Sequence, residues 1–236
     1  MTYVLRPEQR LTATAPPPIA RAMALDLLDE LPAAQRLALA YATATTRRPT
    51  LALLALDARL GAVLRRRGEP VLAQMRFAWW RDRLGSDPAA WPRGDAVLAL
   101  LGEWRDPAAL IPLIDGWEVL VGEVLDSAAI DAFADGRGEA FAALAREVEA
   151  PPAAAQTCGR TWGLADLAAN LANPAERASV LAAAAALPPC PKLPRALRPL
   201  AVLGGLAQRA LQRGGTPLLD GPAAALLAVR LGIVGR

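Results

Sequence analysis

The stretch from Pro49 to Gly85 constrains the fold most, because it has the pattern of two helices joined end to end. Pro49 has the fixed φ angle that suits a first helical turn, and Gly68 ends that helix after three consecutive arginines. Pro70 opens a second helix, which Gly85 closes. Apolar residues at helical spacing predict one buried face on each helix, formed by Leu53, Leu56, Leu60, Val63 and Leu64 and by Leu72, Met75 and Trp79. A chain organised around such a pair is predicted to be helical.

The composition of the rest of the chain also favours helices. Hydrophobic residues make up 54% of the 236 residues, and most of them are alanine and leucine, whereas valine, isoleucine and aromatic residues are sparse. A chain of this length can bury one sizeable core, and no shift in composition suggests a second domain. We therefore predict an all-α fold, a single bundle of about ten helices, with residues 1–17 as a flexible lead-in and residues 18–236 as one domain.

Proline, glycine and asparagine divide the remaining sequence into further predicted helices. Ser127 is expected to cap a short helix that ends at Gly136, and Pro112 is expected to kink a longer one. The proline-rich segment 187–194 is expected to be a stiff connector. The predicted helices span residues 19–30, 32–45, 95–104, 106–125, 127–136, 139–149, 151–172, 175–186, 195–212 and 217–233.

Several function classes are disfavoured by composition alone. The chain has no histidine, which excludes imidazole bases and histidine-ligated metals, and its two cysteines, Cys158 and Cys190, have neither zinc spacing nor a secretory context. The net charge is only +3, with basic residues scattered among acids, so a nucleic-acid surface is not expected. The N-terminus lacks an apolar signal core, and no run of apolar residues is long enough to cross a membrane. These features predict a cytoplasmic protein without a transmembrane segment, although the arginines at 65–67 are compatible with peripheral contact with the headgroups of the inner membrane.

Two runs in the central stretch carry a resemblance to a known family. The runs RRPTLALLALDARLG at 47–61 and GEPVLAQMRFAWWRDRL at 68–84 resemble the squalene/phytoene synthase family, most closely the branch that includes the mitochondrial complex I assembly factor and its bacterial relatives. The resemblance is strongest over residues 37–84 and continues more weakly through WGLADLAANL at 162–171. It implies an isoprenoid-synthase-like helical fold.

The same resemblance implies where a metal site would lie. In active members of the family, two aspartate-rich motifs hold Mg²⁺ against the diphosphates of the substrates, because carboxylates one helical turn apart can chelate the ion together. The first motif falls here on Gly61, Ala62 and Arg65, and Asp57 stands alone one turn earlier. The second falls on Asn173-Pro174. Both acidic clusters are therefore missing, and no magnesium or other cofactor is expected.

A remnant of the family's pocket is still predicted. Asp166, Asn170 and Asn173 share one helical face, which has two readings, a leftover pocket wall or a solvated stripe with a helix cap. The candidate residual pocket consists of Asp57, Gly61, Arg65, Arg76, Trp80, Asp166, Asn170 and Asn173.

Other charged and aromatic pairs have suggestive spacing. The acidic pairs Asp131/Asp135, Asp26/Glu30 and Asp115/Glu118 have chelating spacing, but none falls on the matched motifs, so surface positions are the preferred interpretation. In the tryptophan-rich helix, Arg76 could stack on Trp80, and Arg83 on Trp79. This face has two readings: a pocket wall or partner surface, or a core face in which Met75 and Trp79 are buried and Trp80 is half-buried beneath arginine stems. We favour the core reading for Trp79, and for Trp80 both readings stay open.

Three functional hypotheses follow from the resemblance. The preferred one is a catalytically degenerate family member with a binding or assembly role, for example in the maturation of a respiratory complex through a membrane-complex subunit. The alternatives are an active Mg²⁺-dependent prenyl-diphosphate transferase with a displaced metal site, and a prenyl-lipid binding protein. Magnesium-dependent release of pyrophosphate separates the transferase from the other two.

Overall fold

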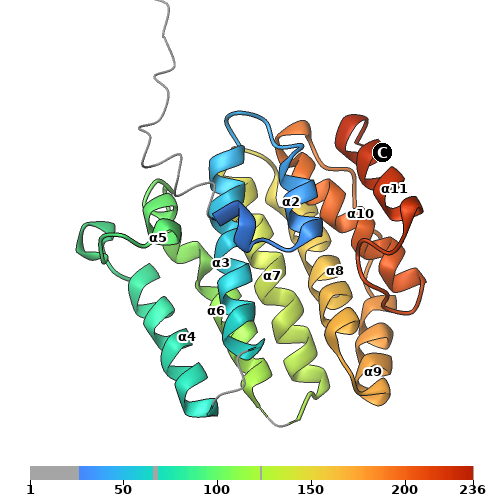
Figure 1. Cartoon of the computed structure of the whole chain (residues 1–236), viewed down its shortest axis with the longest axis horizontal. Coiled ribbons are helices and arrows are strands. Elements are labelled where there is room, and N and C mark those ends of the chain that lie inside the picture. The colour runs from blue at the N-terminus through green and yellow to red at the C-terminus, as the bar shows by residue number, and fades with distance from the viewer. Residues whose placement is uncertain (1–26, 66–68, 123, 236) are drawn as a thin grey trace, which may run out of the picture.

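The structure, a computed structural model, describes residues 27–65, 69–122 and 124–235, and over these residues the all-α prediction is confirmed (Figure 1). The described residues contain ten complete α-helices and four short 3₁₀ helices, together with the helical residues 27–30 and the connecting loops, and they contain no strand. The predicted lead-in, and all but the last turn of the helix predicted at 19–30, lie outside them.

The helices follow one another with short connections. They are α2 (Ala33–Leu39), α3 (Arg47–Arg65), α4 (Pro70–Leu84), η1 (Pro88–Ala90), α5 (Ala96–Leu101), η2 (Pro107–Leu110), α6 (Ile111–Glu118), η3 (Val119–Val121), α7 (Ser127–Glu147), α8 (Pro152–Asn170), α9 (Pro174–Ala185), η4 (Arg195–Leu197), α10 (Arg198–Gln212) and α11 (Pro222–Ile233). Figure 1 shows α3 near the middle of the molecule, with α4 at one edge and α11 at the opposite edge.

The central helix α3 is more deeply buried than its sequence pattern predicts. The expected residues Leu53, Leu56, Leu60 and Val63 are buried, but so are residues on the other sides of the helix, including Leu51 and Leu54. The helix also begins at Arg47, which places Pro49 in its first turn rather than at its first position. An apolar helix enclosed on most sides lies in the core, and α2, α4, α5, α6 and α7 pack against it.

Helix α4 begins and ends where predicted, but the predicted buried face is wrong. Leu72, Met75 and Trp79 are 50%, 63% and 39% exposed, whereas Phe77 is fully buried and Trp80 is only 6% exposed. The helix carries two apolar stripes, and the buried one, formed by Ala73, Phe77, Trp80 and Leu84, extends further along it. In this rotation Arg81 pairs with Asp115 and Glu118 of α6.

Helix α7 runs unbroken through the glycine that was expected to end it. Two helices were predicted at 127–136 and 139–149, but a single helix spans Ser127–Glu147, and Asp126 rather than Ser127 is its N-cap. A Cβ atom at Gly136 would overlap the Pro112 carbonyl oxygen of α6 and would lie 3.1 Å from the Gly116 Cα atom. Gly136 therefore allows two helix backbones to touch and does not terminate a helix.

The segment predicted as one kinked helix at 106–125 is instead a 3₁₀ turn, the eight-residue helix α6 and a second 3₁₀ turn. Pro112 lies in the first turn of α6, where its missing N–H costs nothing. The last helix starts at Pro222, five residues later than predicted, after Gly221 with its positive φ of 77°. The other boundaries differ from the predictions mainly at α2, which ends at Leu39 rather than Thr45.

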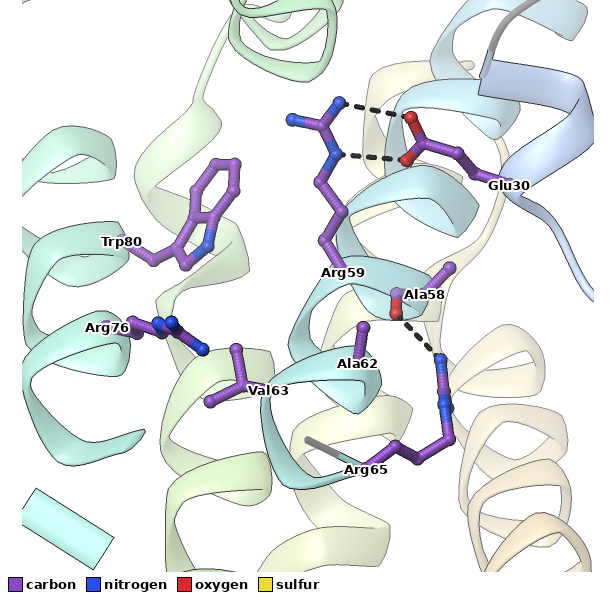
Figure 2. Close-up of a pocket in the computed structure, with 8 residues that line it drawn as sticks. All are labelled: Glu30, Ala58, Arg59, Ala62, Val63, Arg65, Arg76 and Trp80. Atoms are coloured by element: carbon purple, nitrogen blue, oxygen red, sulfur yellow. Dashed lines mark hydrogen bonds and ion pairs between the residues drawn. The ribbon is translucent and has the colours of Figure 1, made fainter. Parts of the chain in front are cut away.

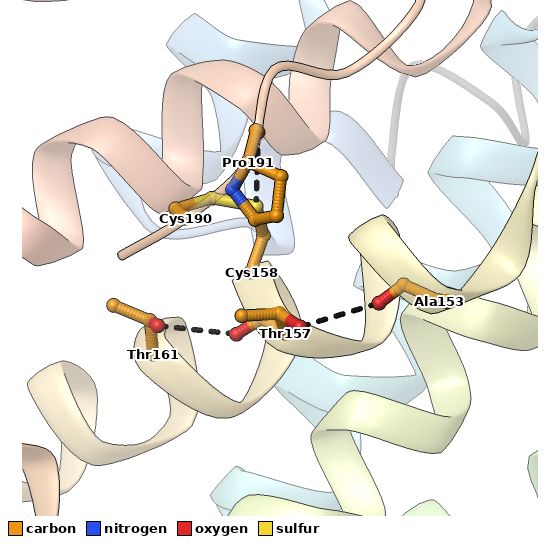
Figure 3. The surroundings of a disulfide bond; sticks show 6 residues. All are labelled: Ala153, Thr157, Cys158, Thr161, Cys190 and Pro191. Atoms are coloured by element: carbon orange, nitrogen blue, oxygen red, sulfur yellow. Dashed lines mark hydrogen bonds between the residues drawn. A yellow bond between two sulfur atoms is a disulfide. The ribbon is translucent and has the colours of Figure 1, made fainter. Parts of the chain in front are cut away.

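A disulfide bond between Cys158 of α8 and Cys190 of the proline-rich connector was not predicted from the sequence (Figure 3). The two Cα atoms are 4.9 Å apart, and Cys158 is fully buried against Gly204 of α10. The bond fixes the connector 187–194 on the body of the bundle. Disulfides are typical of oxidising compartments, so this bond would be unusual at the predicted cytoplasmic location.

We expect the Cys158→Ala/Cys190→Ala variant to lose about 2–3 kcal/mol of unfolding free energy, because the bond closes a 32-residue separation and restricts the unfolded chain. Urea unfolding of the wild type with and without dithiothreitol, beside the variant, measures this loss. If the reductant shifts the variant's midpoint as much as that of the wild type, the effect does not come from this bond.

Over the described residues, no helix combines the length and the apolar character needed to cross a membrane.

Candidate functional site

A buried arginine lies at the centre of the helices that form the candidate site. Arg137, in the middle of α7, has a side chain that is 1% exposed. Its guanidinium carbon lies 4.8 Å from the ring centroids of Trp117 and Phe133 and 4.3 Å from that of Trp162. Aromatic faces attract a cation, and this attraction is stronger where water is excluded. Three rings from α6, α7 and α8 thus surround one positive charge.

Two carboxylates neutralise this charge. The Arg137 Nε and Nη2 atoms donate to the two oxygens of Asp57 on α3, over 3.0 and 3.1 Å. The Nη1 atom donates to Asp166 on α8 over 2.8 Å. The bidentate geometry with Asp57 matches the fork of the guanidinium to the carboxylate, and it connects α3, α7 and α8 through one side chain.

Asp57 accepts two further hydrogen bonds. The Trp117 indole N–H donates to Oδ1 over 2.9 Å, and the Gln35 amide donates to Oδ2 over 3.3 Å. Burial raises the pKa of Asp57 above its ordinary value, with the charge of Arg137 acting in the opposite direction. Burial alone would lower the pKa of Arg137, but the charges of Asp57 and Asp166 outweigh it and raise that pKa, so the guanidinium stays protonated.

Arg137 is not among the residues predicted for the site. The one feature of the sequence that could have pointed to it is its position between two glycines inside a helix, Gly136 and Gly138.

A pocket of about 370 Å³ lies beside this ion-pair cluster. Its lining combines the polar groups of the cluster with Phe133 and several leucines. The residues that line it are Pro32, Gln35, Asp57, Ala58, Gly61, Leu64, Arg65, Trp117, Leu120, Phe133, Arg137, Asp166, Leu167, Asn170 and Leu171. Its volume lies within the range of small-molecule sites, roughly 300–1,000 Å³. The Gln35 Oε1 atom is buried and has no hydrogen-bond partner among the described residues.

The structure brings five of the eight predicted site residues together in this pocket and places the other three elsewhere. The five are Asp57, Gly61, Arg65, Asp166 and Asn170. Asn173 does not line the pocket: it is the N-cap of α9, and its side-chain oxygen accepts a hydrogen bond from the Ala175 N–H over 2.9 Å. For Asn173 the helix-cap reading is therefore the correct one. Asp166 and Asn170 do share a face, since the Asn170 amide donates to the Asp166 side chain.

Arg76 and Trp80 line a different groove, which lies between α3 and α4 and has a volume of about 510 Å³ (Figure 2). The Arg76 side chain points from α4 toward Val63 of α3. Arg59 also lines this groove, but Glu30 and Asp95 already pair with it. The predicted stacking of Arg76 on Trp80 and of Arg83 on Trp79 does not form. Trp80 instead contacts Trp79 edge to face, with ring centroids 5.0 Å apart.

Arginines pair with members of all three predicted acidic pairs. Asp135 binds Arg160 over 3.1 Å, and Asp115 and Glu118 both bind Arg81. Glu30 binds Arg59, and its predicted partner Asp26 lies outside the described residues. Within ranges 27–65, 69–122 and 124–235, no three of the carboxylate and thiol side chains are grouped as a metal site requires.

The side chains of the pocket do not fit a magnesium ion. Mg²⁺ needs several oxygen ligands free to coordinate it. The two carboxylates that line the pocket, Asp57 and Asp166, are held by the guanidinium of Arg137, and a cation placed between them would meet its positive charge. The local chemistry is that of a salt-bridge cluster beside a half-apolar pocket.

Comparisons with protein-family models, with curated proteins and with solved structures gave no significant match for this chain.

Proposed function

We propose that this chain is a non-catalytic binding protein, a degenerate relative of the squalene/phytoene synthases that transfers no prenyl group. One observation carries the proposal: the pocket's two carboxylates are both bound to the buried guanidinium of Arg137. A leaving diphosphate needs cations gathered by free acids, and here the acids are already neutralised. The relation to the family, its isoprenoid-synthase-like fold and an assembly role rest on the sequence resemblance.

The lining of the pocket favours a ligand with an apolar chain and a small polar end, which a prenyl lipid provides. Leu120, Leu167 and Leu171 offer an apolar wall of the kind that holds such a chain. Gln35 and Asn170 add polar side chains to the same lining. The prenyl-lipid reading is therefore the form of the binding hypothesis that the pocket supports best.

The catalytic part is tested by incubating the purified full chain with farnesyl or geranylgeranyl diphosphate and Mg²⁺. We expect no release of pyrophosphate above the rate without protein, because the described part of the chain has no acidic cluster that positions the ion. Turnover that is abolished by Asp131→Ala, or by Asp57→Ala in a variant that remains folded by circular dichroism, would establish the active transferase with a displaced metal site instead.

The binding part is tested with farnesol and geranylgeraniol, followed by the total tryptophan emission. The variant Trp117→Phe identifies the part of the signal that comes from the indole lining the pocket. We expect saturable quenching that Leu171→Arg weakens at least about tenfold, because it places a charge on the apolar wall. Leu181→Arg is the matched control, since Leu181 is also half-buried but lines a separate pocket between α9 and α10. Equal losses in both variants, or no saturable quenching in the wild type, would contradict a ligand in this pocket.

A further inference from the structure

The outer face of α4 is apolar and has no covering element among the described residues. Leu72, Met75 and Trp79 lie at i, i+3 and i+7, so they form one stripe, and Val71 extends it by one turn from Met75. Their exposed fractions run from 39% for Trp79 to 63% for Met75. We call these four residues the α4 stripe. The opposite face of the helix, with Phe77 and Trp80, is the one that packs on the bundle.

Positive charge borders this stripe. Arg76 and Arg83 follow its Leu72–Trp79 edge, on the side of the groove between α3 and α4. Arg76 is exposed and points toward that groove, whereas Arg83 is half-buried with its Nε atom buried. Neither forms an ion pair with any described residue. Arg81, on the far side of the helix, is neutralised by α6. Asp82 is the one acid within α4. An apolar stripe edged by uncompensated arginines matches a surface that is apolar inside and negative outside.

We propose that α4 lies in the plane of an anionic phospholipid bilayer, with the α4 stripe in the acyl boundary and Arg76 and Arg83 at the phosphate level. A tryptophan such as Trp79 suits this boundary, since its ring is apolar and its N–H is polar. A second copy of the chain fits this face less well. In a dimer through α4, Arg76 and Arg83 of both copies would come close together, and each copy would supply a single acid, Asp82, to offset their charge. The proposal does not depend on any ligand of the central pocket.

Helix α11 provides an internal control, because it carries a similar apolar stripe at the opposite edge of the molecule (Figure 1). Leu226, Val229 and Ile233 are 71%, 42% and 69% exposed, but Arg230 is the one basic residue within that helix and no aromatic residue joins the stripe. A flat bilayer cannot contact both edges at once. Variants of α11 therefore report on apolar exposure without the proposed binding face.

The test is co-sedimentation of the full chain with vesicles of phosphatidylcholine that contain about 30% phosphatidylserine. This fraction gives the vesicles a strongly negative surface. We expect Arg76→Gln/Arg83→Gln to weaken partitioning on the order of twentyfold, since each basic residue near such a surface contributes about a fivefold change. Leu72→Ser/Met75→Ser is expected to weaken it at least about tenfold. Leu226→Ser/Arg230→Gln on α11 should leave it unchanged, and Asp82→Asn should strengthen it.

A second readout locates the contact. All six tryptophans lie in the described residues, and the other five are at most 8% exposed, so brominated lipid should quench mainly Trp79. Trp79→Phe should remove that quenching while the thermal melt stays unchanged. Equal binding to pure phosphatidylcholine, equal losses from the α11 variants, or a dimer in analytical ultracentrifugation that Met75→Ser dissolves would each overturn the proposal.

Discussion

Replacing Arg137 by methionine is expected to lower the free energy of unfolding by about 3–5 kcal/mol, one of the largest losses available in this chain. The variant leaves the carboxylate of Asp57, 2% exposed, without its cation. Breaking a buried ion pair from one side costs this much because the remaining charge stays buried and unpaired. Methionine has a similar length, so the loss is mainly electrostatic and not a cavity effect. Urea unfolding followed by circular dichroism measures it.

The loss should depend on pH in a defined direction. Without Arg137, the pKa of the buried Asp57 is raised further above its ordinary 3.8, so the folded state binds a proton that the unfolded chain has already released. The stability of the variant then falls as the pH rises from the ordinary pKa to the raised pKa of the folded state, and it stays constant above that. The variant should therefore be closest to the wild type near pH 4 and furthest from it at pH 7.

Two further variants make this prediction specific. Arg137→Met leaves two carboxylates without their cation, Asp57 and the less buried Asp166. Adding Asp57→Leu removes the more deeply buried charge but also the acceptor of Trp117 and Gln35. The double variant should recover about 1 kcal/mol, because an unpaired buried charge costs more than a buried donor without an acceptor. Arg160→Met breaks a surface pair with Asp135, whose partners are 34% and 56% exposed, and should cost less than about 1 kcal/mol. A double variant as unstable as Arg137→Met alone would show that the cluster is not held by charge.

Placing a leucine at Gly136 is expected to cost about 4 kcal/mol. The side chain would be driven into the carbonyl of Pro112 and the backbone of Gly116, neither of which can rotate away. Helices α6 and α7 would have to separate, which would also move Trp117 away from Asp57. The helix propensity gained on replacing glycine, about 1 kcal/mol, offsets only part of this.

Gly102→Ala is the matched control, because the added Cβ would make only ordinary contacts at 3.4 Å or more at the end of α5. It should leave the thermal midpoint within a few degrees of the wild type or raise it slightly. Comparable midpoints for Gly136→Leu and Gly102→Ala would mean that the two helix backbones do not touch at Gly136.

The sequence predicts where many of these helices lie but not how they are rotated or joined. The ends of α4 follow from Pro70 and Gly85, whose effects are local. Its buried face does not follow, because Leu72 and Phe77 belong to two apolar stripes, and which of them is buried depends on the neighbouring helices, including the acids of α6 that pair with Arg81. Gly136 misleads for a related reason: a glycine that ends a helix and one that admits a neighbouring helix look alike in a single sequence.

The candidate site shows the same limit. Asp57 and Asp166 were found by comparison with motif positions, and both do line one pocket. The side chain that links them, Arg137, is 80 residues from Asp57 along the chain, so no local pattern connects the two. A buried arginine is also improbable from composition alone, since arginine is rarely buried without a partner. The pairing emerges only when α3, α7 and α8 come together.

The disulfide has a topological consequence for the covalent chain. Because Cys158 is bound to Cys190, the last turns of α8, all of α9 and the first part of the connector form a closed loop, with the two ends of the polypeptide leaving it as tails. A single cut anywhere inside that loop opens the ring but leaves one molecule. Proteolysis of this region is therefore silent on a non-reducing gel and shows as two fragments only after a thiol is added.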